Sequence, residues 1–477
     1  MKKILFVGAE VMPFAATGGL GDVLGSLPAA LKREYQDDID IRVVMPLYDA
    51  IKPEWRNQMK QEAIINIPLS WRNLYCGIHS LVKDGVTYYF IDNEYYFKRG
   101  SLYGFDDDAE RYAFFCKAAV EMLGVVGYYP DVLHAHDWQA ALSLAYLNFE
   151  YRWRKEYQGI KTVFTIHNIE YQGQFPNRIV GSVFGFGPSN YLDYNGCVNL
   201  MKCAIEMANV VTTVSPRYAE EIKSDEYAHG LAPMLNKNAH KLTGILNGID
   251  YNYYNPETDY AIYQNYGSGE LDKKRVNKTE LQKSLGLPVR EDVPLVAIVS
   301  RLASHKGLDL VRDIAYRLVD NHDIQLVVLG KGEAQYESFF TDLERNRGDK
   351  VRALMMYDRD LSKCIYAAAD IFLMPSKSEP CGLSQMIASR YGAIPVVRET
   401  GGLYDSIKGY WMLNGTILGN GFTFANYSPD ELYERTSAAI ELYHNKEIYP
   451  VFVKKIMDTD FSWGVSARKY YMLYERM

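Results

Sequence analysis

Three charged side chains stand directly after apolar runs that read as buried strands. Arg301 and Lys306 follow the run 295–299 in SRLASHKGLDL, and Glu379 follows the run 370–374 in PSKSEPCGL. Two cations on a strand-to-helix turn are suited to bind a diphosphate and to stabilise charge on a leaving group. A lysine in the first turn of a helix opposes the helix dipole by roughly 0.3–1 kcal/mol, which makes sense if an anion lies over the helix start. The alternative is a solvated surface pair.

The acid Glu379 precedes a predicted helix start that lies in the segment Cys381-Gly382-Leu383-Ser384. Backbone N–H groups at such a start favour a phosphate. The residue types alone leave two roles open for Glu379, a helix cap and a group that touches a substrate. Cys381 reads as a small packing residue of the turn, not as a nucleophile.

The tetrapeptide TGGL occurs twice, at residues 17–20 and 400–403, each time after an apolar strand (4–9 and 393–397). Glycine pairs in this position let backbone N–H groups approach a ligand closely, and the helix that follows favours negative charge. Two such loops, one near each end of the chain, predict two nucleotide-fold halves that face one cleft.

Polar side chains also follow two strands of the first half. His134, His136 and Asp137 end the strand 132–134 and its extension, and His167 and Asn168 end the strand 162–166. Ligand sites of parallel sheets form at such strand ends. A metal site is the weaker interpretation because no further ligand cluster accompanies the histidines. Asp137 is also a good N-cap for the helix that follows.

Strand and helix patterns alternate along almost the whole chain, which predicts an α/β protein with parallel sheets covered on both faces. An inserted β-rich patch covers residues 63–92, with Asp84-Gly85 as a hairpin turn. The polar, turn-rich segment 247–274 reads as linker and loop. A length of 477 residues exceeds one ordinary core, so we expect two Rossmann-like domains, residues 1–246 and 247–460, followed by a last helix at 461–477.

Composition excludes several classes of protein. Hydrophobic residues make up 48% of the chain, enough for two cores, and the net charge of −7 with a pI near 5.8 argues against nucleic acid or an anionic membrane as a main partner. The six cysteines form no C-x-x-C pair, so a disulfide framework or zinc ribbon is not expected. No apolar stretch approaches the roughly 18–20 residues of a membrane span. The N-terminal MKKILFVGAE reads as a first strand, and we expect a cytoplasmic protein.

Eight motifs in order carry a family resemblance over essentially the full length: TGGLGDV, HAHDW, HNIEYQG, VSPRYAEEI, LNGID, SRLASHKG, SEPCGL and VVRETGGL. The chain resembles bacterial glycogen synthases and plant-type starch synthases, which are two-domain glycosyltransferases of the GT-B architecture. The resemblance implies transfer of glucose from ADP-glucose to the non-reducing end of an α-1,4-glucan with retention at the anomeric carbon. It also implies that the last helix crosses back to the N-terminal domain and that neither a metal nor an organic cofactor is needed.

The resemblance assigns roles to individual residues. It implies that Glu379 holds the donor glucose and supports an oxocarbenium-like transition state, that Arg301 and Lys306 hold the diphosphate, and that His167 and Asp137 line the reacting centre. The implied donor contacts are Thr17, Gly18, Gly19, Asp22, Asn247, Tyr357, Cys381, Gly382, Leu383 and Ser384, with Tyr357 stacking on adenine. The implied acceptor contacts are Glu10, Tyr95, Tyr96 and Tyr103.

One departure from the family pattern weakens this expectation. The family places a lysine directly before TGGL, and this chain has Ala16. A missing charge-assisted contact of about 1.5–3 kcal/mol predicts a weakened transferase. A UDP-glucose-dependent transferase, a non-catalytic glucan-binding relative and a pyridoxal-dependent phosphorylase remain alternatives, although the phosphorylase cofactor-lysine signature is absent from the sequence.

Overall fold

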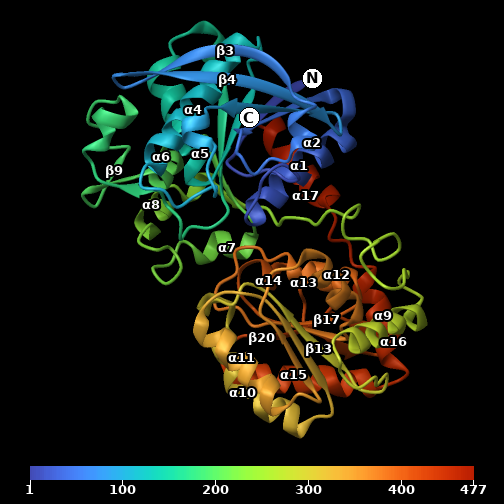
Figure 1. Ribbon diagram of the computed structural model, residues 1–477. Helices are drawn as coiled ribbons and strands as arrows, with labels where there is room; N and C mark the ends of the chain where they lie inside the picture. Colours follow the sequence, from blue (N-terminus) through green and yellow to red (C-terminus); the bar gives the residue numbers. More distant parts are fainter. The chain divides into compact units, whose positions relative to one another are not determined.

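The structure, a computed structural model, describes residues 1–477. The chain forms two compact units (Figure 1). Unit 1 contains residues Met1–Asn247 together with Trp463–Met477, and unit 2 contains Gly248–Ser462. These divisions lie within two residues of the predicted boundaries. None of the helices combines the length and the apolar character that crossing a bilayer requires.

Unit 1 is built on a nine-stranded sheet in which seven neighbouring strands are parallel. Strands β2 to β5 lie on one side of β1, and the later strands, beginning with β6, lie on its other side. The strand order therefore reverses between β1 and β6. In spatial order the strands are β12 (Leu242–Gly244), β11 (Val210–Thr213), β7 (Lys161–Ile166), β6 (Val132–His136), β1 (Lys2–Val7), β2 (Ile39–Pro46), β5 (Val86–Asp92), β4 (Arg72–Lys83) and β3 (Lys60–Leu69).

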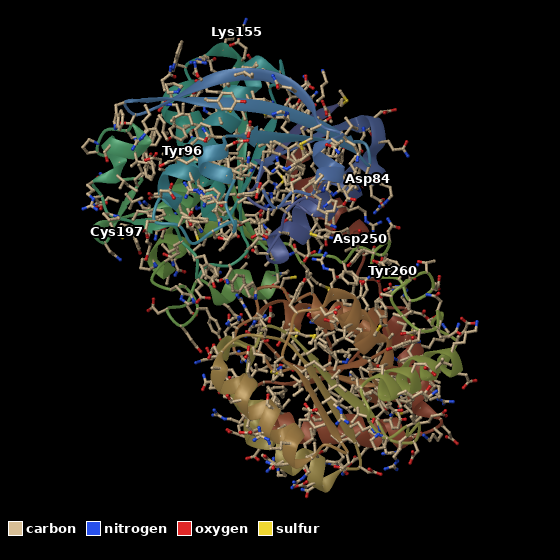
Figure 2. The ribbon with its side chains drawn as sticks, in the orientation of Figure 1. Asp84, Tyr96, Lys155, Cys197, Asp250 and Tyr260 are labelled. Carbon is tan, nitrogen blue, oxygen red and sulfur yellow. The ribbon has the colours of Figure 1, made fainter.

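The outer strands β3 and β4 are antiparallel and correspond to the predicted β-rich insertion. Asp84, labelled in Figure 2, and Gly85 connect β4 to β5 with φ angles of 53° and 75°. Two positive φ angles in a two-residue loop match the twist of the flanking strands. The predicted hairpin turn is therefore present at these two residues.

The helices of unit 1 cover the sheet, and the last helix of the chain belongs to this unit. They are α1 (Gly19–Tyr35), α2 (Pro53–Arg56), α3 (Glu94–Phe97), α4 (Asp108–Val125), α5 (Asp137–Tyr146), α6 (Leu200–Met207), α7 (Pro216–Glu221), α8 (Ala232–Lys237) and α17 (Trp463–Glu475). Helix α17 lies beside α1 (Figure 1). The rings of Tyr35 in α1 and Tyr471 in α17 stack with their centroids 3.7 Å apart. The predicted return of the last helix to the N-terminal domain is thus confirmed.

Unit 2 contains a six-stranded sheet that is parallel throughout. In spatial order its strands are β15 (Val351–Leu354), β14 (Gln325–Leu329), β13 (Leu295–Val299), β16 (Ile371–Met374), β17 (Ile394–Arg398) and β20 (Phe422–Phe424). This is the 3-2-1-4-5-6 order of a Rossmann sheet, and its order reverses between β13 and β16.

Helix α10 of unit 2 buries one apolar face, whereas the buried face of α9 is mostly polar. In α10, Leu308, Val311, Ile314, Ala315 and Leu318 recur at the helical spacing and are all buried. The helices are α9 (Leu271–Ser284), α10 (Leu308–Asn321), α11 (Ala334–Asn346), α12 (Arg359–Ala368), α13 (Ser384–Arg390), α14 (Gly401–Ser406), α15 (Pro429–His444) and α16 (Ile448–Met457). Of the segment 247–274 that was predicted as linker and loop, residues 248–270 form turns of this unit, but α9 begins at Leu271, so the prediction is wrong for the last four residues.

Candidate active site

The predicted site residues gather where the strand order of each sheet reverses. In unit 2, Arg301 and Lys306 follow β13, and Glu379 follows the neighbouring strand β16. In unit 1, Glu10 and Thr17 follow β1, and Asp137 follows the neighbouring strand β6. Open parallel sheets bind ligands outside the carboxyl ends of the strands at this reversal point. Each unit therefore presents its polar residues at the place where a Rossmann sheet holds its ligand.

Lys306 and Glu379 form an ion pair in unit 2. The Nζ atom of Lys306 lies 2.7 Å from Oε2 and 3.0 Å from Oε1 of Glu379. The side chains are 19% and 8% exposed. Ser376 adds a hydrogen bond from its Oγ to Oε2 at 2.9 Å. The carboxylate of Glu379 is thus held in one orientation, and the side chain of Lys306 remains partly exposed to solvent.

Two local expectations at this pair are wrong. Glu379 is not a helix cap, because α13 begins only at Ser384 with Leu383 as its N-cap residue. Lys306 does not lie in the first turn of α10, which begins at Leu308 after Gly307 at φ 70°. The ion pair with Glu379 therefore replaces the helix dipole as the main electrostatic partner of Lys306.

The second TGGL loop supports the backbone of Glu379. The N–H of Gly402 donates to the carbonyl of Glu379 at 3.1 Å. A Cβ on Gly401 would lie 2.0 Å from that same carbonyl oxygen, and a Cβ on Gly402 would lie 2.0 Å from the carbonyl oxygen of Cys381. Close packing between two protein loops therefore leaves no room for a side chain at either glycine.

Arg398 is a buried supporting residue that sequence reasoning did not place. Its Nε donates to the carbonyl of Ser376 at 2.9 Å, and its guanidinium also bonds to the carbonyl of Lys377. An arginine at the end of a predicted parallel strand was the available signal. Because the guanidinium is occupied by the loop, Arg398 is not a mobile cation.

The other predicted donor contacts of unit 2 are accessible to different degrees. Arg301 is exposed, and the Tyr357 side chain is 80% exposed three residues beyond β15. Arg359 forms a hydrogen bond with Tyr357 that raises the pKa of the guanidinium. Gly382 has φ 71°, and Cys381 is buried in the turn.

Glu10 of unit 1 is a buried hub, not an open contact. It is 4% exposed. Its carboxylate accepts four hydrogen bonds: from the N–H of Thr17 at 2.5 Å, the Oγ1 of Thr17 at 2.8 Å, the N–H of Gly18 at 3.0 Å and the hydroxyl of Tyr103 at 2.7 Å. The prediction that Glu10 contacts an acceptor is therefore corrected. Glu10 instead connects the first TGGL loop to Tyr103 through hydrogen bonds.

The first TGGL loop differs from the second. A Cβ on Gly18 or Gly19 would meet no atom within 4 Å, and both residues are exposed. Helix α1 begins at Gly19 and carries Asp22 in its first turn. Here the glycines face open space at a helix start, so this loop has the geometry expected for close approach of a ligand.

Residue 16 lies beside the first turn of α1. A Cβ on Gly21 would lie 2.3 Å from the Cβ of Ala16 and 3.5 Å from the Cβ of Glu10. Ala16 is half-buried. A longer side chain at this position would therefore start next to the Glu10 hub and must leave it toward solvent.

Asp137 and His167 are brought together from neighbouring strands β6 and β7. Oδ1 of Asp137 accepts a hydrogen bond from the backbone N–H of His167 at 2.8 Å, and not from its own helix. Asp137 has φ 56°, a strained conformation of the kind that clusters at functional sites. Burial raises the pKa of Asp137 to about 7 and lowers the pKa of His167 to about 3.

The histidines before Asp137 are engaged with protein groups. His134 Nδ1 lies 2.8 Å from the hydroxyl of Tyr474 in α17, and its Nε2 lies 2.6 Å from Oγ1 of Thr165. His136 Nδ1 lies 2.9 Å from Nε2 of His167. The two rings that suggested a metal site are thus tied to the last helix and to His167.

The three tyrosines predicted to bind an acceptor differ in exposure. Tyr95 is 74% exposed, whereas Tyr96 is 1% exposed with its hydroxyl bonded to Glu110. Tyr96 therefore belongs to the core and cannot stack on a glucan, which corrects that prediction.

Asn247 is buried, and its Oδ1 has no hydrogen-bond partner. An unpaired buried acceptor is what a ligand hydroxyl could satisfy.

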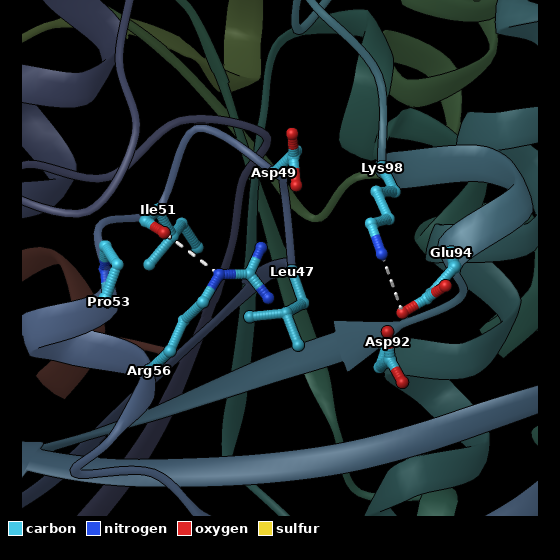
Figure 3. A pocket seen from close by; sticks show the side chains of 8 residues that line it. All are labelled: Leu47, Asp49, Ile51, Pro53, Arg56, Asp92, Glu94 and Lys98. Atoms are coloured by element: carbon cyan, nitrogen blue, oxygen red, sulfur yellow. Dashed lines mark hydrogen bonds and ion pairs between the residues drawn. The ribbon is translucent and has the colours of Figure 1, made fainter.

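A pocket of about 300 Å³ lies elsewhere on unit 1, at the ends of β2 and β5 (Figure 3). Arg56 and Lys98 lie on its wall, but Arg56 donates to the carbonyl of Ile51 and Lys98 pairs with Glu94. None of the predicted site residues lines it. This pocket is therefore separate from the strand-end residues.

Comparison with known proteins decides the family. Residues 3–237 match the family model "Starch synthase catalytic domain", and residues 278–449 match "Glycosyl transferases group 1". Glycogen synthases of Desulforamulus reducens and Bacillus subtilis are 46% and 45% identical to this chain, each over 100% of the chain and 98% of the relative. The chain belongs to the glycogen and starch synthase family.

A solved structure of the same family gives the fold independently. The catalytic domain of starch synthase IV from Arabidopsis thaliana, which was solved with ADP and acarbose bound, matches with a TM-score of 0.90 at 35% identity. The match covers 100% of this chain and 99% of that chain. The predicted family and the GT-B fold class are both confirmed.

Proposed function

We propose that the protein is a retaining glucosyltransferase that adds glucose from ADP-glucose to the non-reducing end of an α-1,4-glucan, as a glycogen synthase does. The Lys306–Glu379 pair is the observation that carries this proposal. It joins a cation and a carboxylate at the strand reversal of a Rossmann sheet, where a nucleotide sugar presents a diphosphate and sugar hydroxyls side by side.

The ion pair is the resting state of the donor site in this proposal. An arriving diphosphate offers Lys306 a stronger counter-charge, with Arg301 as the second cation. Glu379 is then released to accept hydrogen bonds from the glucose hydroxyls and to stabilise positive charge near the anomeric carbon. Tyr357, held by Arg359, offers its exposed ring to the base.

The proposed chemical step retains the configuration at the anomeric carbon. The bond between the anomeric carbon and the phosphate oxygen breaks, and the acceptor O4 forms its bond on the same face. The O4 proton passes to the departing phosphate, so the products are ADP and a glucan longer by one glucose. Arg301 and Lys306 stabilise the charge that develops on the phosphate, the role that a metal ion has in other phosphate sites, and we propose that no metal or organic cofactor takes part.

Unit 1 supplies the acceptor side in this proposal. The exposed ring of Tyr95 and the Tyr103 that Glu10 orients can contact glucose rings. Asn247 offers its unpaired Oδ1 to a glucose hydroxyl. We propose that His167 and Asp137 contact the reacting glucose, as the family resemblance implies. We place the enzyme in the cytoplasm, where the six cysteines, none of which is in a disulfide, remain reduced.

Nucleotide release with ADP-glucose or UDP-glucose and maltotriose tests this proposal. We expect release with ADP-glucose to exceed release with UDP-glucose at equal concentration, and release to require the maltotriose primer. Faster release from UDP-glucose would transfer the proposal to the UDP-dependent class. No release from either donor, with glucan still bound, would support a non-catalytic relative, which Ala16 in place of the family lysine makes the second candidate.

A further inference from the structure

We propose that His136 is a positioning residue that fixes His167 in the tautomer with its proton on Nδ1, so that His167 offers an N–H donor to a sugar hydroxyl. The role toward the sugar rests on the proposed function, whereas the tautomer itself does not.

The two rings come from adjacent parallel strands. His136 ends β6 and is paired in register with Thr165 of β7, so His167 follows one step beyond β7 on the neighbouring strand. Nδ1 of His136 lies 2.9 Å from Nε2 of His167. At this distance one of the two nitrogens carries a proton and donates it in a hydrogen bond, and the other nitrogen accepts that bond.

Both rings are neutral. Burial lowers the pKa of His136 well below its ordinary value, and nearby His134 and His167 lower it further. Burial also lowers the pKa of His167 to about 3. A neutral imidazole carries one proton, so only two arrangements are possible. In the first, His136 donates from its Nδ1 to Nε2 of His167. In the second, His167 donates from its Nε2, and the proton of His136 must then lie on Nε2 of His136.

The surroundings of His136 decide between these arrangements. Its Nε2 is buried and has no hydrogen-bond partner. The ring of Phe6 stacks on His136 with an interplanar angle of 23°, and His134 lies at 4.1 Å between ring centroids. The nitrogens of His134 are already used by Tyr474 and Thr165. An N–H on His136 Nε2 would therefore have no acceptor, and buried N–H groups without acceptors are rarer than buried acceptors without donors.

His136 consequently donates from Nδ1 to Nε2 of His167. The proton of His167 must then sit on its Nδ1, which no protein atom engages. An isolated imidazole in water favours the opposite tautomer, with the proton on Nε2. The backbone N–H of His167 is held at the same time by Asp137. Ring and backbone of His167 are thus fixed by two consecutive residues, and Nδ1–H is left to face a ligand.

Three variants separate this role from simple packing. His136→Asn keeps an N–H near the position of the imidazole Nδ1, whereas His136→Asp places a carboxylate oxygen, which can only accept, at the same position. His136→Phe keeps an aromatic ring against Phe6 but supplies neither a donor nor an acceptor. Nitrogen-15 NMR of the full chain with labelled histidine reports which ring nitrogen of His167 carries hydrogen, and His167→Gln identifies the signal among the nine histidines.

We expect His167 to carry its proton on Nδ1 in the unaltered protein and in His136→Asn, and to carry it on Nε2 in His136→Asp, where the carboxylate accepts that N–H. We further expect kcat/KM to fall about tenfold or more in His136→Asp, to fall less in His136→Phe, and to stay within about threefold in His136→Asn. A proton on Nε2 of His167 in the unaltered protein would overturn the proposal, as would an unchanged tautomer in a folded His136→Asp protein. The spectrum needs no turnover, so a protein inactive with both nucleotide sugars would refute the proposed function and leave the tautomer assignment standing.

Discussion

Removing the charge of Glu379 should separate catalysis from nucleotide binding. In Glu379→Gln, Lys306 loses its only carboxylate partner, although its side chain is 19% exposed and can be partly solvated. Breaking a fully buried pair costs 3–5 kcal/mol and an exposed pair about 0.2–1, so we expect the free protein to lose about 1–3 kcal/mol of stability. The liberated lysine then favours an anion.

The same change should leave ADP binding intact or tighter. ADP no longer competes with Glu379 for Lys306, so we expect its affinity to hold or to rise up to about tenfold, which corresponds to about 1.4 kcal/mol. The transition state loses a carboxylate that only it fully uses, so kcat should fall at least about 100-fold. Calorimetric titration with ADP and nucleotide release from ADP-glucose measure the two effects on one preparation.

Two matched controls accompany this variant. Ser376→Ala removes the hydroxyl that bonds to Glu379 but keeps the ion pair, so kcat should fall by less than about tenfold. Asp320→Asn removes an acid that pairs with Arg347 on the surface of the same unit, and ADP affinity should not change. If Glu379→Gln lost ADP affinity by the same factor as kcat, Glu379 would only hold Lys306 in place and the reasoning would be wrong.

Three further predictions concern single residues. Arg301→Ala and Lys306→Ala should each weaken ADP binding at least tenfold by calorimetry, and unaltered affinity in both would exclude their diphosphate role. Asp137→Asn should inactivate the enzyme yet stabilise it. Because the folded-state pKa of Asp137 is about 7 and its ordinary value is 3.8, ionisation of this carboxyl lowers the free energy of unfolding as the pH rises from 4 through 7. By denaturant unfolding, the advantage of the variant over the unaltered protein should therefore be about 2–3 kcal/mol larger at pH 8 than at pH 5. A gap that does not grow with pH would show that Asp137 is not destabilised when ionised. Ala16→Lys should raise the rate with ADP-glucose severalfold; a flat response in an already fast enzyme would mean that another residue supplies that contact.

The alternation of strands and helices along the chain and the location of both strand-end clusters could be predicted from the sequence, whereas the order of the strands within each sheet was not predicted. Buried parallel strands are continuous apolar runs, and polar residues directly after them mark the carboxyl edge of the sheet. This places Arg301, Glu379, Asp137 and His167 correctly without any contact information. The identical TGGL loops were predicted to act alike, but only tertiary packing distinguishes an open Gly18 from glycines pressed against a second loop.

Pairings across long sequence distances could not be predicted. Lys306 and Glu379 are 73 residues apart, and their contact depends on the side-by-side placement of β13 and β16. Helix α10 begins at Leu308, later than predicted, because Gly307 lies against the carbonyl of Pro375, where a Cβ would be 2.0 Å from the oxygen. Tyr95 and Tyr96 are neighbours of the same type, and only the docking of the four-residue helix α3 decides which one is buried.

Analysis of the glucan product tests the central claim most directly. The protein is incubated with ADP-glucose labelled in its glucose and with maltotriose, and the products are separated and examined by NMR at the new anomeric carbon. Our account predicts label at the non-reducing end in an α-1,4 linkage, with one ADP released per glucose added. A β-linked product, label at the reducing end, or ADP release without elongation of the glucan would contradict it.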